Sequence, residues 1–359
     1  MTTTAPEIRA FIAGLPKAEL HVHLVGSASV PTVLELANRY PDAGVPTDEA
    51  ALAAFYEFTD FAHFIEVYIA VNSLVRTGAD IEALVVGIAA DMAAQQIRYA
   101  EVTATPDSHL LVDIPAEDVA VAYTEGRERA LAEHGVEIAW IFDIPGELGL
   151  PSGLRTIDWV EHHAPAGSVG FGLGGPEVGV DRAQFADVFR RAQALGLASV
   201  PHAGETTGPE TVWAALTHLG ADRIGHGISS VRDPALLAHL AEHGIPLEVC
   251  PTSNLRTRAV ERIEDHPFPA LRDAGVVVTL NSDDPGMFAT TLCGEYEVVH
   301  DVFGVDRLGL AELARTAVRA SFRSDAGKRA LRAEIDAYEA RALSPGRVDA
   351  GAATPGNVT

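Results

Sequence analysis

The sequence ELHVHLVGS, residues 19–27, decides the fold, because it reads as a short apolar strand that ends in two histidines. Side chains alternate across a strand, so His21 and His23 project to one side while Val22 and Leu24 point into the opposite layer. Two imidazoles on one face are suited to bind one metal ion. Many His-x-His pairs are merely half-buried strand histidines, so the meaning of this pair depends on what the later strands bring beside it.

Seven further apolar runs, separated by helical patterns, follow this strand. Together with residues 19–24 they give eight candidate strands, the others being 97–103, 137–142, 169–173, 198–202, 223–225, 246–249 and 276–280. Helices are expected between them, for instance at 116–133, 181–195, 209–219, 234–243 and 267–274. Strands that alternate with helices and are buried on both faces are typical of a closed parallel sheet, so we predict an α/β fold of the (β/α)8 TIM-barrel type. An open doubly wound sheet is the alternative, although no Gly-x-Gly-x-x-Gly motif opens a first crossover.

The other segments are expected to complete one domain, residues 1–342. A short amphipathic helix at 6–13 precedes the barrel, and C-terminal helices are expected at 308–321 and 327–342. Residues 343–359 are rich in Pro, Gly, Ala and Thr without an apolar period, so we expect a disordered tail.

Residues 31–96 are too long for one crossover helix, and we predict an insertion over the mouth of the barrel. Helical patterns occur in it at 32–40, 48–56, 61–75 and 81–94. Its aromatic residues Phe55, Phe58, Phe61 and Phe64 are candidates for an apolar lid. The alternative is that these rings pack only among themselves.

The composition limits the partners of the protein. Lys and Arg number 26 and Asp and Glu number 50, so the formal net charge is −24, which argues against nucleic acid and anionic membranes as partners. No signal peptide and no run of about 18 apolar residues is seen, and Cys250 and Cys293 are too few for a disulfide framework. We therefore expect a cytoplasmic protein, and 359 residues suit one barrel.

Polar motifs follow the later strands at the points where these strands end. PHAGE supplies His202 and Glu205, RIGHG supplies His226, and NSDDP supplies Asp283 and Asp284. Each residue alone has an ordinary structural explanation, such as a turn, a helix cap or a solvated loop. In parallel barrels, however, the reacting residues occupy the C-terminal ends of the strands, so the shared register favours a catalytic site.

Three imidazoles and one carboxylate are expected to hold a single metal ion. The expected ligands are His21, His23, His202 and Asp283. This nitrogen-rich set suits Zn²⁺ better than Mg²⁺ or Ca²⁺, while iron, cobalt and nickel stay possible. Bound zinc lowers the pKa of its water from about 15.7 toward about 7, which predicts hydrolytic chemistry. His226 would then orient or deprotonate the water, Glu205 would protonate a ring nitrogen, and Asp284 would hydrogen-bond the substrate.

Taken in order, the motifs HVHLVGS, GFGLGGPE, HAGE, RIGHG, CPTSN and NSDDP resemble the adenosine deaminase family of metal-dependent aminohydrolases over about residues 16–288. The resemblance implies one zinc ion on the four ligands, Asp283 among the catalytic residues, and hydrolytic deamination at C6 of a 6-aminopurine nucleoside. It also implies that Glu205 protonates N1, that His226 assists the attacking water, and that Asp284 bonds N7. Gly175 would offer its backbone N–H to N3.

Three positions depart from the adenosine-specific members of that family. Val25 stands where those members have an aspartate that bonds the ribose 5′-hydroxyl, Gly172 replaces another aspartate, and Pro176 precedes Glu177. Because valine cannot accept that bond, we expect a nucleoside with an apolar or aromatic 5′ extension, such as 6-amino-6-deoxyfutalosine of the menaquinone pathway. Adenosine and then adenine are the competing substrates. Candidates to contact the 5′ group are Phe58, Phe61, Tyr99 and Glu101.

Three other classes of protein compete with a purine deaminase. Metal-dependent ester or amide hydrolases on the same barrel often bridge two metals with a modified lysine at the fourth strand, but SVGFGLGG, residues 168–175, has no lysine. Cytidine-type deaminases use a Pro-Cys-x-x-Cys signature, which neither cysteine of this chain forms. Barrels kept only for binding usually lose a ligand or the proton donor, and this chain retains both. The oligomeric state stays open.

Overall fold

Eight parallel strands form one sheet in the order β1 to β8 in the computed structural model, which describes residues 5–343. The strands are β1 (Lys17–His23), β2 (Ile97–Ala104), β3 (Glu137–Pro145), β4 (Ser168–Gly174), β5 (Ala198–Ala203), β6 (Ile224–His226), β7 (Leu247–Val249) and β8 (Val278–Leu280). Each lies within a few residues of a predicted strand, so the (β/α)8 barrel is confirmed. The predicted tail lies outside the described residues, apart from Leu343.

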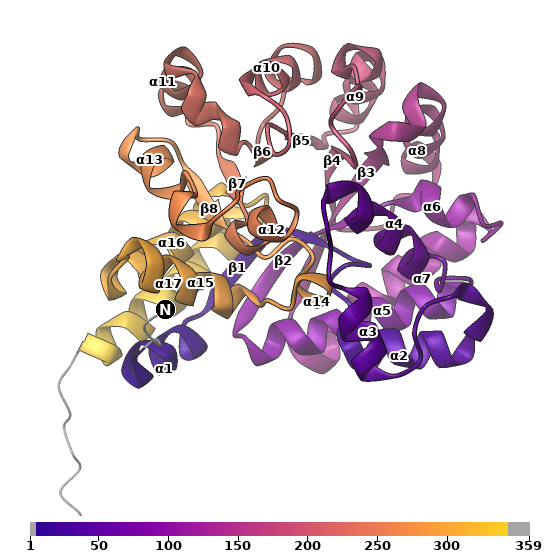
Figure 1. The fold of residues 1–359 in the computed structure, drawn as a ribbon, viewed down its shortest axis with the longest axis horizontal. Helices are drawn as coiled ribbons and strands as arrows, with labels where there is room; N and C mark the ends of the chain where they lie inside the picture. The colour runs from indigo at the N-terminus through magenta and orange to yellow at the C-terminus, as the bar shows by residue number, and fades with distance from the viewer. Residues whose placement is uncertain (1–4, 344–359) are drawn as a thin grey trace, which may run out of the picture.

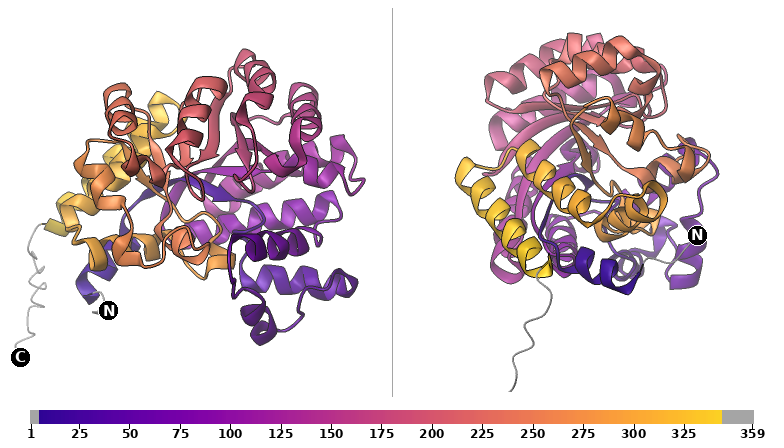
Figure 2. Two further views of the ribbon diagram at one scale, coloured as in Figure 1. Left: turned by 45° about the horizontal axis from the view of Figure 1, so that its top comes forward. Right: turned by 90° about the vertical axis from the view of Figure 1, so that its left-hand side faces the viewer.

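Helices surround the strands on the outside (Figures 1 and 2). They are α1 (Pro6–Gly14), α2 (Val30–Arg39), α3 (Glu49–Phe55), α4 (Phe61–Asn72), α5 (Gly78–Ala94), α6 (Pro106–Leu110), α7 (Ala116–Arg129), α8 (Gly149–His163), α9 (Ala186–Ala194), α10 (Pro209–Ala214), α11 (Pro234–His243), α12 (Pro251–Arg256), α13 (Phe268–Asp273), α14 (Pro285–Phe288), α15 (Leu292–Phe303), α16 (Arg307–Ala320) and α17 (Asp325–Leu343). Short helical turns are η1 (Pro41–Ala43), η2 (Ala130–His134), η3 (Gly146–Leu148), η4 (Arg182–Phe185), η5 (Ala215–Leu219), η6 (Ile228–Arg232) and η7 (Ile263–Asp265).

The barrel closes where β1 meets the residues that follow β8. The backbone N–H of His23 donates to the carbonyl of Asp283 at 2.9 Å, and the N–H of Asp283 donates to the carbonyl of His21 at 3.1 Å. Below them the N–H of Leu20 donates to Asn281 Oδ1 at 2.9 Å. The backbone bonds that close the barrel therefore also fix the positions of three predicted metal ligands.

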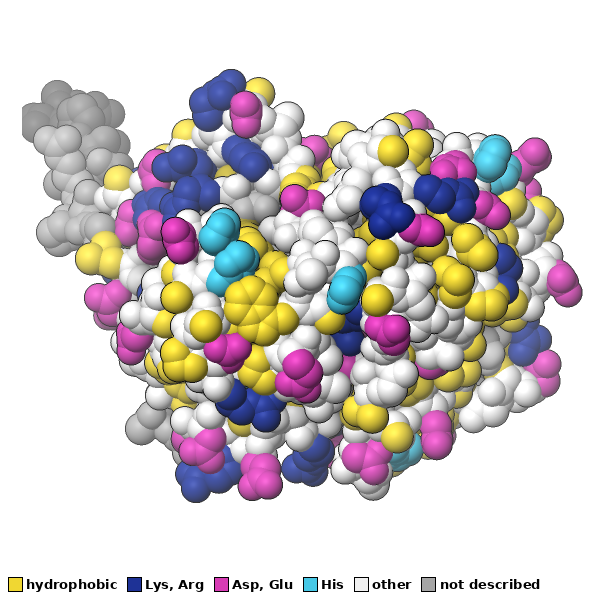
Figure 3. Space-filling model, turned by 90° about the horizontal axis from the view of Figure 1, so that it is seen from above, with side chains coloured by type: hydrophobic (Ala, Val, Ile, Leu, Met, Phe, Trp, Pro, Cys, Tyr) yellow, Lys and Arg dark blue, Asp and Glu magenta, His cyan; other side chains and the backbone are white. Residues whose placement is uncertain are grey.

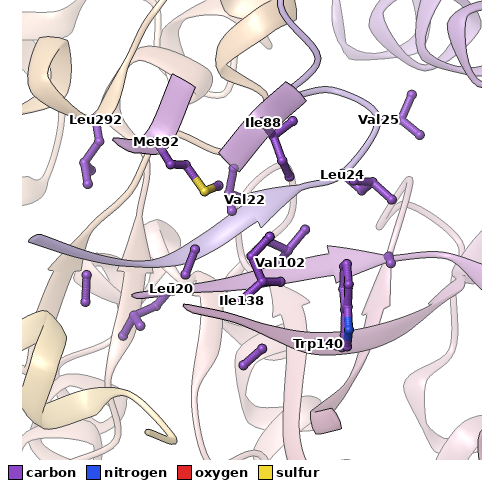
Figure 4. Packing of buried hydrophobic residues seen from close by; sticks show 14 of the residues in the cluster. Leu20, Val22, Leu24, Val25, Ile88, Met92, Val102, Ile138, Trp140 and Leu292 are labelled. Atoms are coloured by element: carbon purple, nitrogen blue, oxygen red, sulfur yellow. The ribbon is translucent and has the colours of Figure 1, made fainter. Parts of the chain in front are cut away.

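The alternation predicted for β1 is present in the structure. Val22 and Leu24 are buried among apolar residues, and Figure 4 shows Val22 beside Ile88 and Met92 of α5. His21 and His23 consequently face the interior of the barrel. Packing of the apolar side of this strand against α5 therefore sets the direction of the two histidines.

The segment predicted as an insertion divides into two parts. Helices α2, α3 and α4 gather on one side of the barrel (Figure 1), as an addition to the basic fold. Helix α5 instead packs against α7 and β2, so it is the barrel's own crossover helix between β1 and β2. The segment predicted as an insertion, residues 31–96, therefore includes from Gly78 to Ala94 a helix that packs on the barrel, and apolar periodicity alone does not separate the two kinds of helix.

The C-terminal helices complete the outer layer. Helix α16 packs against β1 and β8, where it covers the closing seam, and α17 packs on α16. Acidic and basic side chains are interspersed on the face that Figure 3 shows, so the net negative charge is not collected into one patch there. Within residues 5–343, no helix combines the length and the apolar character that crossing a bilayer requires.

Candidate active site

The four predicted ligands converge inside the barrel at the C-terminal ends of β1 and β5 and beyond β8. One side-chain atom of each lies within 4.8 Å of the others, and we call His21, His23, His202 and Asp283 the ligand cluster. His23 Nε2 is 3.2 Å from His202 Nε2 and 3.3 Å from Asp283 Oδ1. Tetrahedral zinc with ligands at about 2.0–2.1 Å separates its ligand atoms by about 3.3 Å. The spacing therefore fits a small divalent ion.

The protonation of the cluster also fits a cation site. Burial lowers the pKa of His23 to about 4 and the pKa of His202 well below the ordinary value, so both imidazoles are neutral at pH 7. Burial would raise the pKa of Asp283, but the nearby charge of His21 holds it well below its usual range. The buried Nε2 atom of His21 makes no hydrogen bond among the described residues and lies 3.4 Å from Asp283 Oδ1. Burial would lower the pKa of His21, but Asp283 and Glu248 raise it to about 10, so a bound cation would take the place of a proton on this ring.

Second-layer hydrogen bonds fix the orientation of the ligands. Glu248 Oε2 lies 2.8 Å from His21 Nδ1, and the carbonyl of Leu173 lies 3.0 Å from His202 Nδ1. Each partner accepts from Nδ1–H and leaves Nε2 free to bind metal. The hydroxyl of Ser253 donates to Asp283 Oδ2 at 2.6 Å and leaves Oδ1 toward the imidazoles.

Close packing of the histidines depends on a glycine before His226. A β-carbon added to Gly225 would lie 2.8 Å from the His21 ring and 3.2 Å from the His202 ring, so only glycine fits there. His226 and Asp283 themselves have positive φ values of 60° and 66°. Non-glycine residues in this region typically store about 1–3 kcal/mol of strain and cluster at functional sites. Both residues leave the strand geometry where their side chains turn into the site.

Glu205 is placed and protonated by its surroundings. Burial, together with the negative charges of Asp283 and Glu177, raises its pKa to about 8, so the carboxyl carries a proton at pH 7. The hydroxyl of Thr257 donates to Glu205 Oε1 at 3.0 Å. The group is therefore a proton donor already oriented toward the cavity.

Glu177, which belongs to the motif GFGLGGPE, holds the loop that carries Glu205. Its carboxylate accepts from the backbone N–H groups of Gly204, Glu205 and Thr206 at 2.7–2.8 Å. Arg182 pairs with the same carboxylate at 2.9 Å. The motif thus acts through a buried anion that organises the HAGE loop.

A chain of hydrogen bonds assigns the proton position on His226. The backbone N–H of Phe268 donates to His266 Nδ1 at 3.0 Å, so His266 carries its proton on Nε2 and donates to Asn254 Oδ1 at 3.1 Å. The amide nitrogen of Asn254 therefore faces His226 Nδ1 at 3.2 Å. Burial lowers the pKa of His226 to about 4, so the ring is neutral and bears its proton on Nε2, 3.7 Å from Asp283 Oδ2.

Asp284 is a second acid whose pKa is raised by its surroundings. Burial raises its pKa well above the ordinary value, and the adjacent charge and hydrogen bond of Asp283 act in the same direction. Its Oδ1 atom is buried with no hydrogen-bond partner in the described part of the chain. A protonated carboxyl can donate to a ring nitrogen, which an ionised one cannot.

A cavity opens above the ligand cluster. Predicted residues that line it are His23, Phe61, Gly175, His202, Glu205, His226, Asp283 and Asp284. Helix α4 contributes one face to its wall, formed by Phe61, Phe64, Ile65, Tyr68, Ile69 and Asn72. Val67 and Val71, which do not line the cavity, are buried on the other side of the helix. The lid expected in this segment is therefore a single helix.

Four residues expected near the 5′ group lie elsewhere. Phe58 is not part of the cavity wall, because its ring packs edge-on against Phe64 and Phe288 at centroid distances of 5.4 and 5.8 Å. Val25 is buried in a small adjoining cavity that shares Tyr68 as a wall. Tyr99 and Glu101 lie within the barrel, where Tyr99 donates to Glu101 at 2.8 Å and Glu101 pairs with Arg223. These two residues belong to the buried ion-pair network that also holds Glu248.

Five residues that shape the site were not given these roles from the sequence. They are Asp143, Glu177, Glu248, Asn254 and His266. A signal existed for Asp143 and Glu248, since each is a lone carboxylate inside an apolar strand, and burial of a charge needs a partner or a function. His266 had no local signal, because its partner Asn254 is reached through the fold.

Comparisons with known proteins agree with this geometry. The family model described as adenosine deaminase matches residues 16–338. The chain is 56% identical to an aminodeoxyfutalosine deaminase of Streptomyces avermitilis, over 95% of this chain and 96% of the relative, and 55% identical to one of Streptomyces coelicolor, over 94% and 88%.

Two solved structures share the fold. An adenine deaminase from Arthrobacter aurescens superposes with a TM-score of 0.86 at 31% identity, over 90% of this chain and 99% of that one. An amidohydrolase from Burkholderia ambifaria, with bound zinc, gives 0.86 at 27% identity over 95% and 97%. The chain belongs to the adenosine deaminase family and is a metal-dependent aminohydrolase.

Proposed function

We propose that this protein uses one zinc ion to hydrolyse the C6 amino group of 6-amino-6-deoxyfutalosine, a 6-aminopurine nucleoside with an aromatic 5′ extension. The observation that carries the proposal is that the ligand cluster, a protonated Glu205 and Asp284, an acid of raised pKa, converge on one cavity. The relatives at 55–56% identity, both aminodeoxyfutalosine deaminases by name, support this substrate over adenosine and adenine.

The donor set favours zinc over the other divalent ions. Three imidazoles and one carboxylate at the observed spacing match a borderline metal, and the neighbour from Burkholderia ambifaria binds zinc. When bound, the ion supplies a water of lowered pKa as nucleophile and stabilises developing negative charge. The ligand cluster would hold it, with Glu248 and Ser253 fixing the ligand orientation.

The protein groups would act on the purine and on the attacking water. Glu205 would donate its proton to N1, which makes C6 more electrophilic, while Asp284 would donate to N7 and the N–H of Gly175 to N3. His226, with its proton on Nε2, would orient the water by donating to its oxygen. The water oxygen would then add to C6 and the bond from C6 to the amino nitrogen would break. One water proton would leave on that nitrogen as ammonia, the other would restore Glu205, and N1 would keep its proton in the 6-oxopurine product. The tautomer assigned to His226 favours the orienting role over deprotonation.

Two features support an apolar group at the 5′ position. The face of α4 toward the cavity carries Phe61, Ile65 and Ile69, which is an apolar surface next to the site. Val25 replaces the aspartate expected in adenosine-specific relatives, so a 5′-hydroxyl has no such acceptor. An aromatic extension would bury apolar area on α4 where a free hydroxyl would gain little.

The test compares kcat/KM for aminodeoxyfutalosine, 5′-deoxyadenosine, adenosine and adenine. The reaction is monitored by the change in absorbance when the 6-amino group is lost. We expect aminodeoxyfutalosine to be best and 5′-deoxyadenosine to be at least as good as adenosine. A strong preference for adenosine over its 5′-deoxy form would contradict the proposal, because a designed hydrogen bond to a hydroxyl typically changes specificity by about 10²-fold or more.

A further inference from the structure

Asp143, at the C-terminal end of β3, faces the cavity with one carboxylate oxygen already held. The hydroxyl of Thr105 donates to Asp143 Oδ1 at 2.5 Å. The residue is 4% exposed and lines the cavity wall. Oδ2 lies over the next strand, where a β-carbon added to Gly174 would be 2.7 Å from it. Thr105 therefore orients the carboxylate so that its second oxygen lies beside Gly174. We call Gly174 and Gly175, at the end of β4, the glycine pair.

Glu147 follows on the other side of the same glycine pair. A β-carbon added to Gly175 would collide with Glu147 Oε2. Gly175 has a φ of +79°, a second reason for glycine at this position. Within residues 5–343, neither Asp143 nor Glu147 forms an ion pair with a basic side chain. Two carboxylates thus border one wall of the cavity without a cation.

The two carboxylates of Asp143 and Glu147 indicate which kind of ligand would bind at this wall. Carboxylates are acceptors, and hydrogen bonds from hydroxyl groups to them are among the strong ones. A ribose presents two adjacent hydroxyl donors, and acidic side chains recognise such diols in other nucleotide-binding folds. A phosphate at the same place would be repelled. The wall is therefore suited to a neutral sugar.

The position of the wall relative to the purine agrees with this chemistry. Under the proposed function, on which this step rests, the N–H of Gly175 meets N3 of the base. N3 and the sugar-bearing N9 are attached to the same ring carbon, C4, so the ribose leaves the base next to Gly175. Asp143 and Glu147 border that glycine pair.

We infer that Asp143, oriented by Thr105, accepts a hydrogen bond from a ribose 2′- or 3′-hydroxyl, with Glu147 beside it at the mouth. Asp143 is then a specificity-determining residue that ties efficient deamination to a complete ribose. It explains why a buried carboxylate is retained at the end of β3 without a cationic partner.

The inference is tested by combining changes in the substrate with changes at Asp143. kcat/KM is measured for 5′-deoxyadenosine and its 2′,5′- and 3′,5′-dideoxy analogues, with the unmodified protein, Asp143→Leu and Asp143→Asn. Leucine has the shape of aspartate without an acceptor, and asparagine keeps one acceptor if the leucine variant folds poorly. Asp118→Asn, an exposed change on α7, is the matched control. Melting temperature and metal content are measured for every variant.

We expect removal of the bonded hydroxyl to lower kcat/KM of the unmodified protein by about 10- to 100-fold. Asp143→Leu should lower it by a similar factor for 5′-deoxyadenosine, and the same deoxy analogue should then show no further loss. The inference would be overturned if the loss of kcat/KM from Asp143→Leu and the loss from removing the hydroxyl multiplied as independent effects. Equal kcat/KM of the unmodified protein for all three nucleosides would also overturn it. If the unmodified protein deaminates neither 5′-deoxyadenosine nor aminodeoxyfutalosine, the proposed function fails instead.

Discussion

The two ends of the cavity are built in opposite ways. At the catalytic end, which comprises the ligand cluster, Glu205, His226 and Asp284, nearly every polar group is buried and held by a second layer of hydrogen bonds. At the sugar end, which comprises Asp143, Glu147 and the α4 face, the wall is partly exposed and Ile69 is 58% exposed. The first end rests on barrel strands and the loops that follow them, whereas the second combines the end of β3 with an added helix.

The difference shows which part of the molecule determines the reaction and which part determines the substrate specificity. Reaction chemistry needs groups fixed to fractions of an ångström, which strand ends and their backbone hydrogen bonds supply. Substrate choice needs a surface that can vary without disturbing those groups, and a helix added before the crossover supplies it. Changes at the catalytic end should therefore lower all activities together, while changes at the sugar end should alter ratios between substrates.

The largest effect is expected from removing a ligand. His202→Ala should abolish tight metal binding and reduce activity to the level of the metal-free protein, a loss beyond about 10⁴-fold, because several kcal/mol of electrostatic stabilisation disappear. Metal content after desalting, measured by mass spectrometry, checks this. Full metal occupancy in the variant would contradict the ligand set.

Removing the proton donor should leave the metal in place. Glu205→Gln is expected to bind metal like the unmodified protein and to lose about 10²- to 10⁴-fold in kcat for every substrate, because N1 is no longer protonated. Steady-state kinetics with two substrates checks the uniformity of the loss. A loss confined to one substrate would place Glu205 at the wrong end of the cavity.

A smaller effect is expected one layer behind the metal. Glu248→Gln keeps the shape but weakens the acceptor for His21 Nδ1, so metal affinity should fall by about 10- to 100-fold. Competition with a chelator measures it. Glu334→Gln, which breaks the surface pair with Arg98, is the control and should change nothing. Unchanged chelator resistance in Glu248→Gln would show that the second layer is not needed.

The pH dependence of kcat/KM should show the ionisation of Glu205. Burial raises the pKa of Glu205 to about 8, and the protonated form is the active one, so kcat/KM should fall as the pH rises above about 8. One unit above that pKa the expected loss is about tenfold. A profile that stays flat to pH 9.5 would mean that Glu205 is not the donor in the free enzyme.

The smallest effect is expected at the sugar end. Phe61→Ala should raise KM for aminodeoxyfutalosine by about 3- to 10-fold and leave 5′-deoxyadenosine nearly unchanged, because only the extended substrate reaches α4. Phe58→Ala is a matched control, since its ring is buried outside the cavity. It should lower the melting temperature and keep the substrate ratio. Equal effects of Phe61→Ala on both substrates would place the 5′ group elsewhere.

The sequence predicted the catalytic end because strand ends in a parallel barrel meet at one rim. Once His21, His202 and Asp283 are assigned to strand ends, their convergence follows from topology alone. The contacts of the second layer could not be predicted, because Glu248 reaches His21 and His266 reaches Asn254 through the fold, which local patterns do not encode. A lone carboxylate in an apolar run, as at Asp143, was a usable signal.

For the sugar end, the sequence predicted the presence of added helices but not the roles of the individual helices and side chains. Periodicity located the helices of the insertion, but it could not distinguish the lid helix α4 from the crossover helix α5, since both are apolar on more than one face. For the same reason Phe58 and Phe61, three residues apart, could not be assigned to packing and to the cavity. Those distinctions depend on which face meets the barrel.

The most direct test of both ends is a crystal structure with the 6-oxopurine nucleoside product bound. The account predicts N1 against Glu205, N7 against Asp284 and one metal ion on the four ligands. It also predicts a ribose hydroxyl on Asp143 and the 5′ extension along Phe61 and Ile69. A base turned with its sugar toward Glu205, or a metal held by other residues, would contradict it.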